Sequence, residues 1–185
     1  MNKLSFSILP SLETIDHEIR ILIDGDDILG KEFLGLDPPV FFNQESLTNG
    51  GYMLIGRCTC GEAGCGSYGV TVVLDQDKVF WNDDSGLSLF FDIQAYESTI
   101  EVAKNDQSWE DIKRRVERLT SVILNKSQTK DGYIFDWASA RIGENKITLS
   151  YNKDGFQKLF ELAWDGRSEN NVEQTARKFL IENLN

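Results

Sequence analysis

Short apolar segments, each ended by a tight polar turn, recur along this chain and limit it to a few folds. The turns lie at Asp24-Gly25-Asp26-Asp27, Asp75-Gln76-Asp77, Gly143-Glu144-Asn145 and Asn152-Lys153-Asp154-Gly155. Glycine, Asn and Asp favour reversal of the chain, and segments joined so closely pair as antiparallel neighbours. The sequence therefore predicts a mainly antiparallel, meander-rich sheet.

The apolar patterns place the strands around these turns. Residues 51–60, 68–74 and 78–82 form an expected three-stranded meander, and residues 87–93 alternate like one more strand. The expected remaining strands are 4–9, 18–24, 133–142, 146–151 and 156–164. We expect only a short helical turn at 28–36, ended by the two prolines at 38 and 39, and a polar surface loop at 43–51.

Helical spacing is clearest over residues 109–125, where the apolar positions are separated by three and four residues in turn. Ser108 and Asp111 resemble a capping box, and the opposite face, with Lys113, Arg114, Glu117 and Arg118, is expected to be solvated. A shorter helix precedes it, near residues 96–103, and a C-terminal helix is expected over 172–183. These patterns predict an α+β fold in a single domain, 1–185, with a seam between sublayers near residues 105–108.

Acidic residues are concentrated in the first part of the chain. Met1–Asp106 contains 18 acidic and 6 basic residues, whereas residues 107–185 contain 12 and 13, for a total net charge of −11. This charge disfavours nucleic acid as a partner and favours a basic protein. No apolar run is long enough to cross a bilayer and the start has no apolar leader core, so we expect no membrane partner and a cytoplasmic location.

All three cysteines, Cys58, Cys60 and Cys65, fall within eight residues. In a strand, Cys58 and Cys60 would share a face, and the glycines that follow would let the chain return Cys65 toward them. Zinc is the candidate cofactor, with Asp83, Asp84 or His17 as the fourth ligand, although these spacings differ from those of common zinc sites. Redox cycling of the thiols and simple packing at a glycine turn are the alternatives.

The run Cys58-Thr59-Cys60-Gly61-Glu62-Ala63-Gly64-Cys65-Gly66, with Val79-Phe80-Trp81, resembles a group of small uncharacterised bacterial proteins. These share a Cys-x-Cys-Gly-x-x-Gly-Cys core and a Val-x-Trp strand. The similarity extends over roughly the first half of the chain, through Ile21-Leu22-Ile23-Asp24-Gly25 and Leu36-Asp37-Pro38. It implies a bacterial origin and no particular activity, cofactor or catalytic residue.

The sequence contains no phosphate-binding loop, dinucleotide fingerprint, nucleophile elbow or metalloprotease helix. We therefore expect a non-enzymatic, acidic module that binds a macromolecule, such as an immunity-like protein that neutralises a toxin. The alternative is a metal- or thiol-dependent enzyme, or a zinc-stabilised domain, that uses the cysteine cluster.

Overall fold

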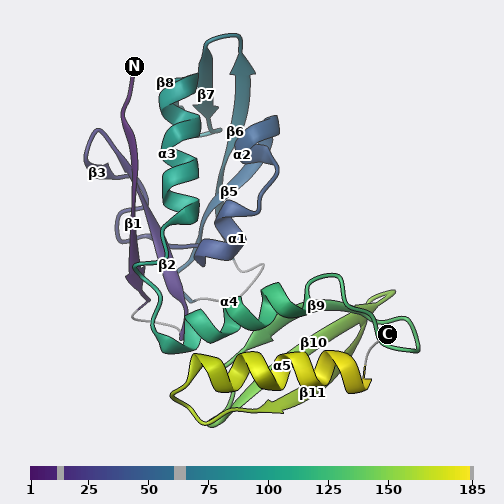
Figure 1. Cartoon of the computed structure of the whole chain (residues 1–185). Helices are drawn as coiled ribbons and strands as arrows, with labels where there is room; N and C mark the ends of the chain where they lie inside the picture. The colour runs from purple at the N-terminus through teal and green to yellow at the C-terminus, as the bar shows by residue number, and fades with distance from the viewer. Residues whose placement is uncertain (12–14, 61–65, 184–185) are drawn as a thin grey trace. The chain divides into compact units, whose positions relative to one another are not determined.

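The structure, a computed structural model, describes residues 1–11, 15–60 and 66–183. It confirms the α+β class, with antiparallel sheets, helices between and after the strands, and a helix at the C-terminal end (Figure 1). The chain divides into two compact units, the N-terminal unit Met1–Trp109 and the C-terminal unit Glu110–Asn185. The expectation of a single domain stays a prediction. None of the described helices has the length and apolar character needed to cross a membrane.

The N-terminal unit contains two antiparallel sheets. The larger has five strands in the spatial order β4 (Phe33–Gly35), β5 (Gly51–Cys58), β6 (Ser67–Asp75), β7 (Lys78–Asn82) and β8 (Ser88–Asp92). The smaller consists of β1 (Leu4–Pro10), β2 (His17–Ile23) and β3 (Asp26–Asp27). The described residues of this unit also form helices α1 (Pro38–Phe42), α2 (Ser46–Asn49) and α3 (Ile93–Asn105). Helix α3 packs against β1, β7 and β8 (Figure 1).

The register of the meander follows the sequence pattern. Leu74 pairs with Val79, as the turn at residues 75–77 predicts, and the ladder continues to Thr71 and Asn82. Alternate residues along these strands point inward, so Val72, Val79 and Trp81 are buried while their neighbours are more exposed. This alternation fixes which face of the sheet α3 covers.

The segment before the meander differs from the expected helical turn at 28–36. Its residues 33–35 form strand β4, which pairs with β5. Arg20 holds the approach to this strand, because its guanidinium donates to the Asp27 carboxylate and to the carbonyl of Phe33. The two prolines begin α1 instead of ending a helix; the first helical turn tolerates proline because its N–H groups have no helical partner. The expected loop at 43–51 includes α2.

In the C-terminal unit, helices pack against an antiparallel sheet of three strands. The strands, in spatial order, are β11 (Phe156–Ala163), β10 (Lys146–Lys153) and β9 (Ile134–Ser139). Helices α4 (Ile112–Leu124) and α5 (Glu169–Asn183) pack on each other, α4 against β9 and α5 against β11. Helix α4 begins three residues later than predicted, because Asp111 is its N-cap and accepts from the Arg114 N–H over 2.8 Å.

Candidate functional site

The cysteine segment lies at the end of β5. Cys58 is half-buried, and its N–H donates to the Gly66 carbonyl over 2.9 Å, while Cys60 is exposed. Cys65 lies outside the described residues. Among the residues that are described, no group of three Cys, His, Asp or Glu side chains is arranged to hold a metal ion. The zinc site at Cys58, Cys60 and Cys65 therefore stays a prediction.

The two aspartates proposed as ligands have different surroundings. Asp83 accepts hydrogen bonds from the side-chain hydroxyls of Ser85 and Tyr68 and from the N–H of Leu87. These bonds, that of Ser85 first, hold the pKa of Asp83 below its usual value. Asp84, the next residue, is exposed. Asp83 thus acts as an acceptor that closes the turn after β7, which is a structural use of its carboxylate.

His17, the third proposed ligand, is buried at the start of β2. Its ring lies 5.0 Å from the ring of Trp109, measured between centroids. Within the described part of the chain, its Nδ1 atom has no hydrogen-bond partner. The structure therefore places His17 against an aromatic ring, in the packing role that a lone histidine commonly has.

A pocket of about 470 Å³ lies between α1, α2 and α3 of the N-terminal unit. This α2–α3 pocket has an apolar floor, formed by Phe42, Leu47, Tyr96 and Ile100. All four are mostly buried, so their exposed edges alone line the hollow. A volume of this size is within the range of ordinary ligand pockets, about 300–1,000 Å³.

Two hydrogen bonds fix the position of Tyr96 in the floor of the pocket. Its hydroxyl donates to the Leu47 carbonyl over 3.1 Å and accepts from the indole N–H of Trp81 at 3.3 Å. Burial raises the pKa of this phenol well above its usual value, so it stays neutral. Because both partners of the hydroxyl belong to the same unit, the Tyr96 side chain contributes mainly its aromatic ring to the pocket surface.

The rim of the pocket is charged and mostly acidic. Glu45, Glu97 and Glu101 carry carboxylates there, against the single ammonium of Lys104. The Lys104 ammonium donates to the Phe42 carbonyl over 3.3 Å, and this bond holds the ammonium at one side of the opening. Within the described residues none of the three glutamates makes an ion pair, so the rim presents uncompensated negative charge. An apolar floor below an acidic rim suits an apolar group with positive charge beside it.

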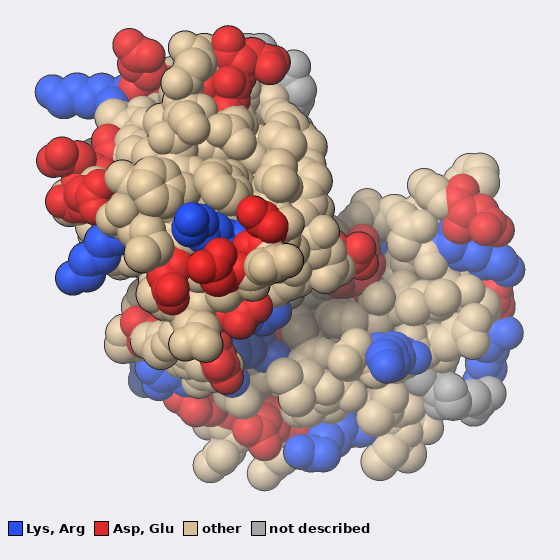
Figure 2. All heavy atoms as spheres, turned by 90° about the horizontal axis from the view of Figure 1, so that it is seen from above, with Lys and Arg blue, Asp and Glu red and all other residues tan. Residues whose placement is uncertain are grey.

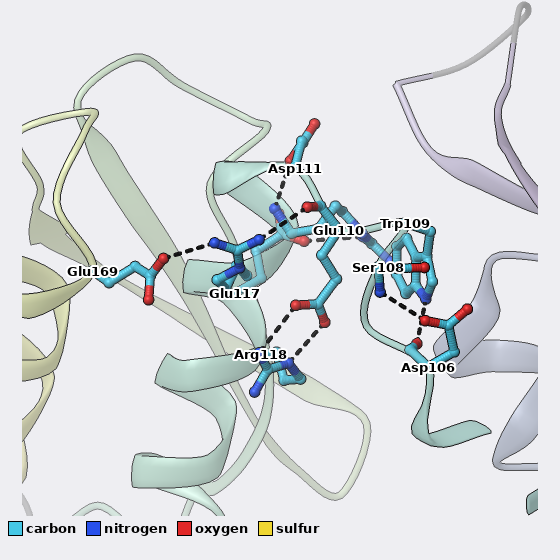
Figure 3. Close-up of polar contacts among 10 residues, drawn as sticks. Asp106, Ser108, Trp109, Glu110, Asp111, Glu117, Arg118 and Glu169 are labelled. Atoms are coloured by element: carbon cyan, nitrogen blue, oxygen red, sulfur yellow. Dashed lines mark hydrogen bonds and ion pairs between the residues drawn. The ribbon is translucent and has the colours of Figure 1, made fainter. Parts of the chain in front are cut away.

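A polar cluster in the C-terminal unit surrounds the first part of α4. The buried carboxylate of Glu110 accepts from Arg118 through two bonds of 2.7 and 3.0 Å (Figure 3). Such two-pronged contacts fix the orientation of both groups. Arg115 donates to Glu169 over 2.9 Å.

Glu117, which lies on α4 next to Arg118, is buried as well. Its carboxylate accepts from Arg114 at 2.9 Å, from Arg141 at 2.9 Å and from the Ala140 N–H at 2.8 Å. The predicted solvated face of this helix is therefore wrong at Arg114 and Glu117, because each buries its charge against the other. With its acceptor positions occupied, this carboxylate is suited to holding β9 and α4 together rather than to proton transfer.

Comparisons with protein-family models, with curated proteins and with solved structures find no match. The function is therefore inferred from the pocket, the charges and the cysteine segment of this chain alone.

Proposed function

We propose that this protein is a non-enzymatic, cytoplasmic binding module whose acidic N-terminal unit recognises a basic protein, with a toxin-neutralising immunity protein as the most specific form. One observation carries the proposal. The N-terminal unit contains 18 acidic and 6 basic residues, a net charge of −12, whereas the C-terminal unit has a net charge of +1. The charge imbalance thus ends where one compact unit ends.

Little of this negative charge is neutralised within the unit. Its ion pairs among the described residues involve Arg20 with Glu18 and Asp27, and Arg57 with Asp16. Figure 2 shows one face of the whole chain, on which acidic side chains lie among basic and uncharged ones. Exposed carboxylates of one sign attract a basic partner and raise its rate of association.

Recovery of partners by the tagged full-length chain tests this proposal. We expect a polypeptide rich in lysine and arginine, whose binding weakens as salt rises from about 0.01 M to about 1 M, because the screening length falls from about 30 Å to about 3 Å. The decisive measurement is then the association rate of the purified pair, compared between two variants of equal charge.

The first variant, Asp75→Asn with Asp77→Asn and Asp84→Asn, neutralises three exposed carboxylates of the N-terminal unit. We expect slower association, because the attracting field is weaker. The control neutralises three carboxylates of the C-terminal unit, at Glu144, Asp154 and Glu173. Equal slowing by both variants, or a partner whose binding is indifferent to salt, would contradict the proposal.

The cysteine segment supports a second candidate, a zinc-stabilised or thiol-dependent protein, because Cys58 ends β5 and the exposed Cys60 follows two residues later. Metal analysis of protein purified without chelators tests it. Stoichiometric zinc that is lost from a Cys58→Ser variant would support this candidate. Metal-free protein with full thermal stability would exclude the zinc form.

A further inference from the structure

We propose that the α2–α3 pocket receives an apolar side chain flanked by lysine or arginine and presented by the basic partner, an inference that rests on the proposed function. The pocket combines an apolar hollow with carboxylates that have no ion pair among the described residues. In protein interfaces, a buried aromatic anchor with surrounding polar contacts carries much of the binding energy.

The floor of the pocket determines what enters it. Phe42, Leu47 and Ile100 have hydrocarbon side chains, and the Tyr96 hydroxyl is hydrogen-bonded to Leu47 and Trp81. A polar group placed there would lose its water and gain no partner in return. The bottom of the site is therefore suited to a phenyl or aliphatic group.

The rim determines what surrounds that group. Glu97 and Glu101 are four residues apart on α3 and so lie on the same side of this helix, and Glu45 lies at the start of α2. All three are exposed at the opening. Positive charges on either side of an inserted apolar residue would lie near these carboxylates, whereas acidic flanks would be repelled.

The occupant is a polypeptide because the carboxylates around the hollow belong to separate segments of the chain. Glu97 and Glu101 are on α3, and Glu45 is the N-cap of α2. A single small cation therefore meets few of these carboxylates, while a basic segment with charges on both sides of its anchor meets more. Lys104 lies at one side, with its ammonium held by the Phe42 carbonyl. The segment is therefore expected to carry its positive charges toward the glutamates and away from this lysine.

Nuclear magnetic resonance titration of the labelled full-length chain with the blocked peptide Lys-Lys-Phe-Lys-Lys tests this site directly. We expect the amide shifts to concentrate at Phe42, Thr48, Glu97 and Glu101. Exchange of the phenylalanine in the peptide for alanine should lower the affinity at least about tenfold, because the apolar anchor is lost. The peptide Glu-Glu-Phe-Glu-Glu should not bind.

Two variants of the protein separate the pocket from the general acidity of the unit. Glu97→Gln with Glu101→Gln should weaken the basic peptide about threefold to tenfold. Asp75→Asn with Asp77→Asn removes the same charge at the β6–β7 turn, away from the residues that line the pocket, and should weaken it less. If both variants weaken peptide binding equally, the pocket is not the binding site. The acidic unit would then attract the basic peptide through its overall charge, and the proposed function would still hold.

A third variant blocks the hollow while keeping its charges. Thr48 lines the pocket and is exposed, so Thr48→Trp should fill the opening without disturbing the core. Loss of peptide binding with an unchanged melting temperature supports the site, and full binding overturns it. If Thr48→Trp does not fold, the comparison of the Glu97→Gln, Glu101→Gln variant with its control tests the site. If free phenethylammonium binds as tightly as the pentapeptide, the occupant is a small cation and the proposal of a polypeptide is wrong.

Discussion

The Tyr68 hydroxyl donates a hydrogen bond to the Asp83 carboxylate across 3.0 Å. This bond joins the beginning of β6 to the turn after β7. Asp83 directly follows Asn82, which pairs with Thr71 in the β6–β7 ladder. The carboxylate of Asp83 thus has hydrogen-bond partners within its own unit, the Tyr68 hydroxyl and the Leu87 N–H.

Tyr68 should ionise only at strongly alkaline pH. Burial, followed by the bond to Asp83 and the charge of Asp83, raises the pKa of Tyr68 from 10.0 to about 12. The folded state favours the neutral phenol, so this contribution to stability is complete below pH 10 and is lost as the pH rises toward 12. Absorbance titration should show one fewer late-ionising tyrosine in Tyr68→Phe. Tyr52→Phe, at an exposed site, is the control, and identical curves for Tyr68→Phe and the wild type would contradict the assignment.

Gly35 should tolerate no side chain. A Cβ atom at this position would lie 2.0 Å from the Ile19 carbonyl oxygen, because β4 passes close to β2. We expect Gly35→Ala to lower the free energy of unfolding by at least about 1–3 kcal/mol, measured by urea denaturation. Gly66→Ala is the control, since the nearest atom to its added Cβ is the Cys58 Cβ at an ordinary 3.6 Å. A smaller loss at Gly35 than at Gly66 would refute the close approach.

The meander could be predicted because its information is local. Alternation along β6 and β7, together with the turn at residues 75–77, is sufficient to pair Leu74 with Val79. The start of α1 was missed for a local reason too: a proline pair ends one helix as readily as it begins another, and only the surroundings decide.

The polar cluster and the pocket depend on distant pairs, and no pattern in the sequence reveals them. Glu117 meets Arg141, 24 residues later, and a buried glutamate has the same spacing on α4 as a solvated one. The pocket brings Leu47 to Tyr96 across 49 residues. The distribution of charge was readable, but which carboxylates surround an apolar hollow was not.

Arg20 should be important for the stability of the N-terminal unit. It is mostly buried, donates to Asp27 through bonds of 2.8 and 2.6 Å, and donates to the carbonyls of Gly30 and Phe33. Replacement by leucine leaves these acceptors without their donor, so Arg20→Leu should cost about 3 kcal/mol in urea denaturation. Arg177→Leu, at an exposed position on α5, should change stability by less than about 0.5 kcal/mol. Similar losses for both would show that the Arg20 contacts are unimportant.

Glu117→Gln should destabilise the C-terminal unit without changing the size of the side chain. The substitution would remove the negative charge between Arg114 and Arg141, and the glutamine NH₂ group would point a donor at the donors of these arginines. Because Glu117 is only 6% exposed, we expect a cost of about 3 kcal/mol in the free energy of unfolding.

Glu173→Gln makes the same chemical change on α5, where the described residues offer Glu173 no ion pair, and should leave stability within about 0.5 kcal/mol of the wild type. The proposed binding site provides a further check, because Glu117 belongs to the other unit. Under conditions where the variant is folded, Glu117→Gln should bind Lys-Lys-Phe-Lys-Lys as the wild type does. A variant that is as stable as Glu173→Gln would show that the buried carboxylate contributes no net stabilisation, and the role assigned to it on α4 would be wrong.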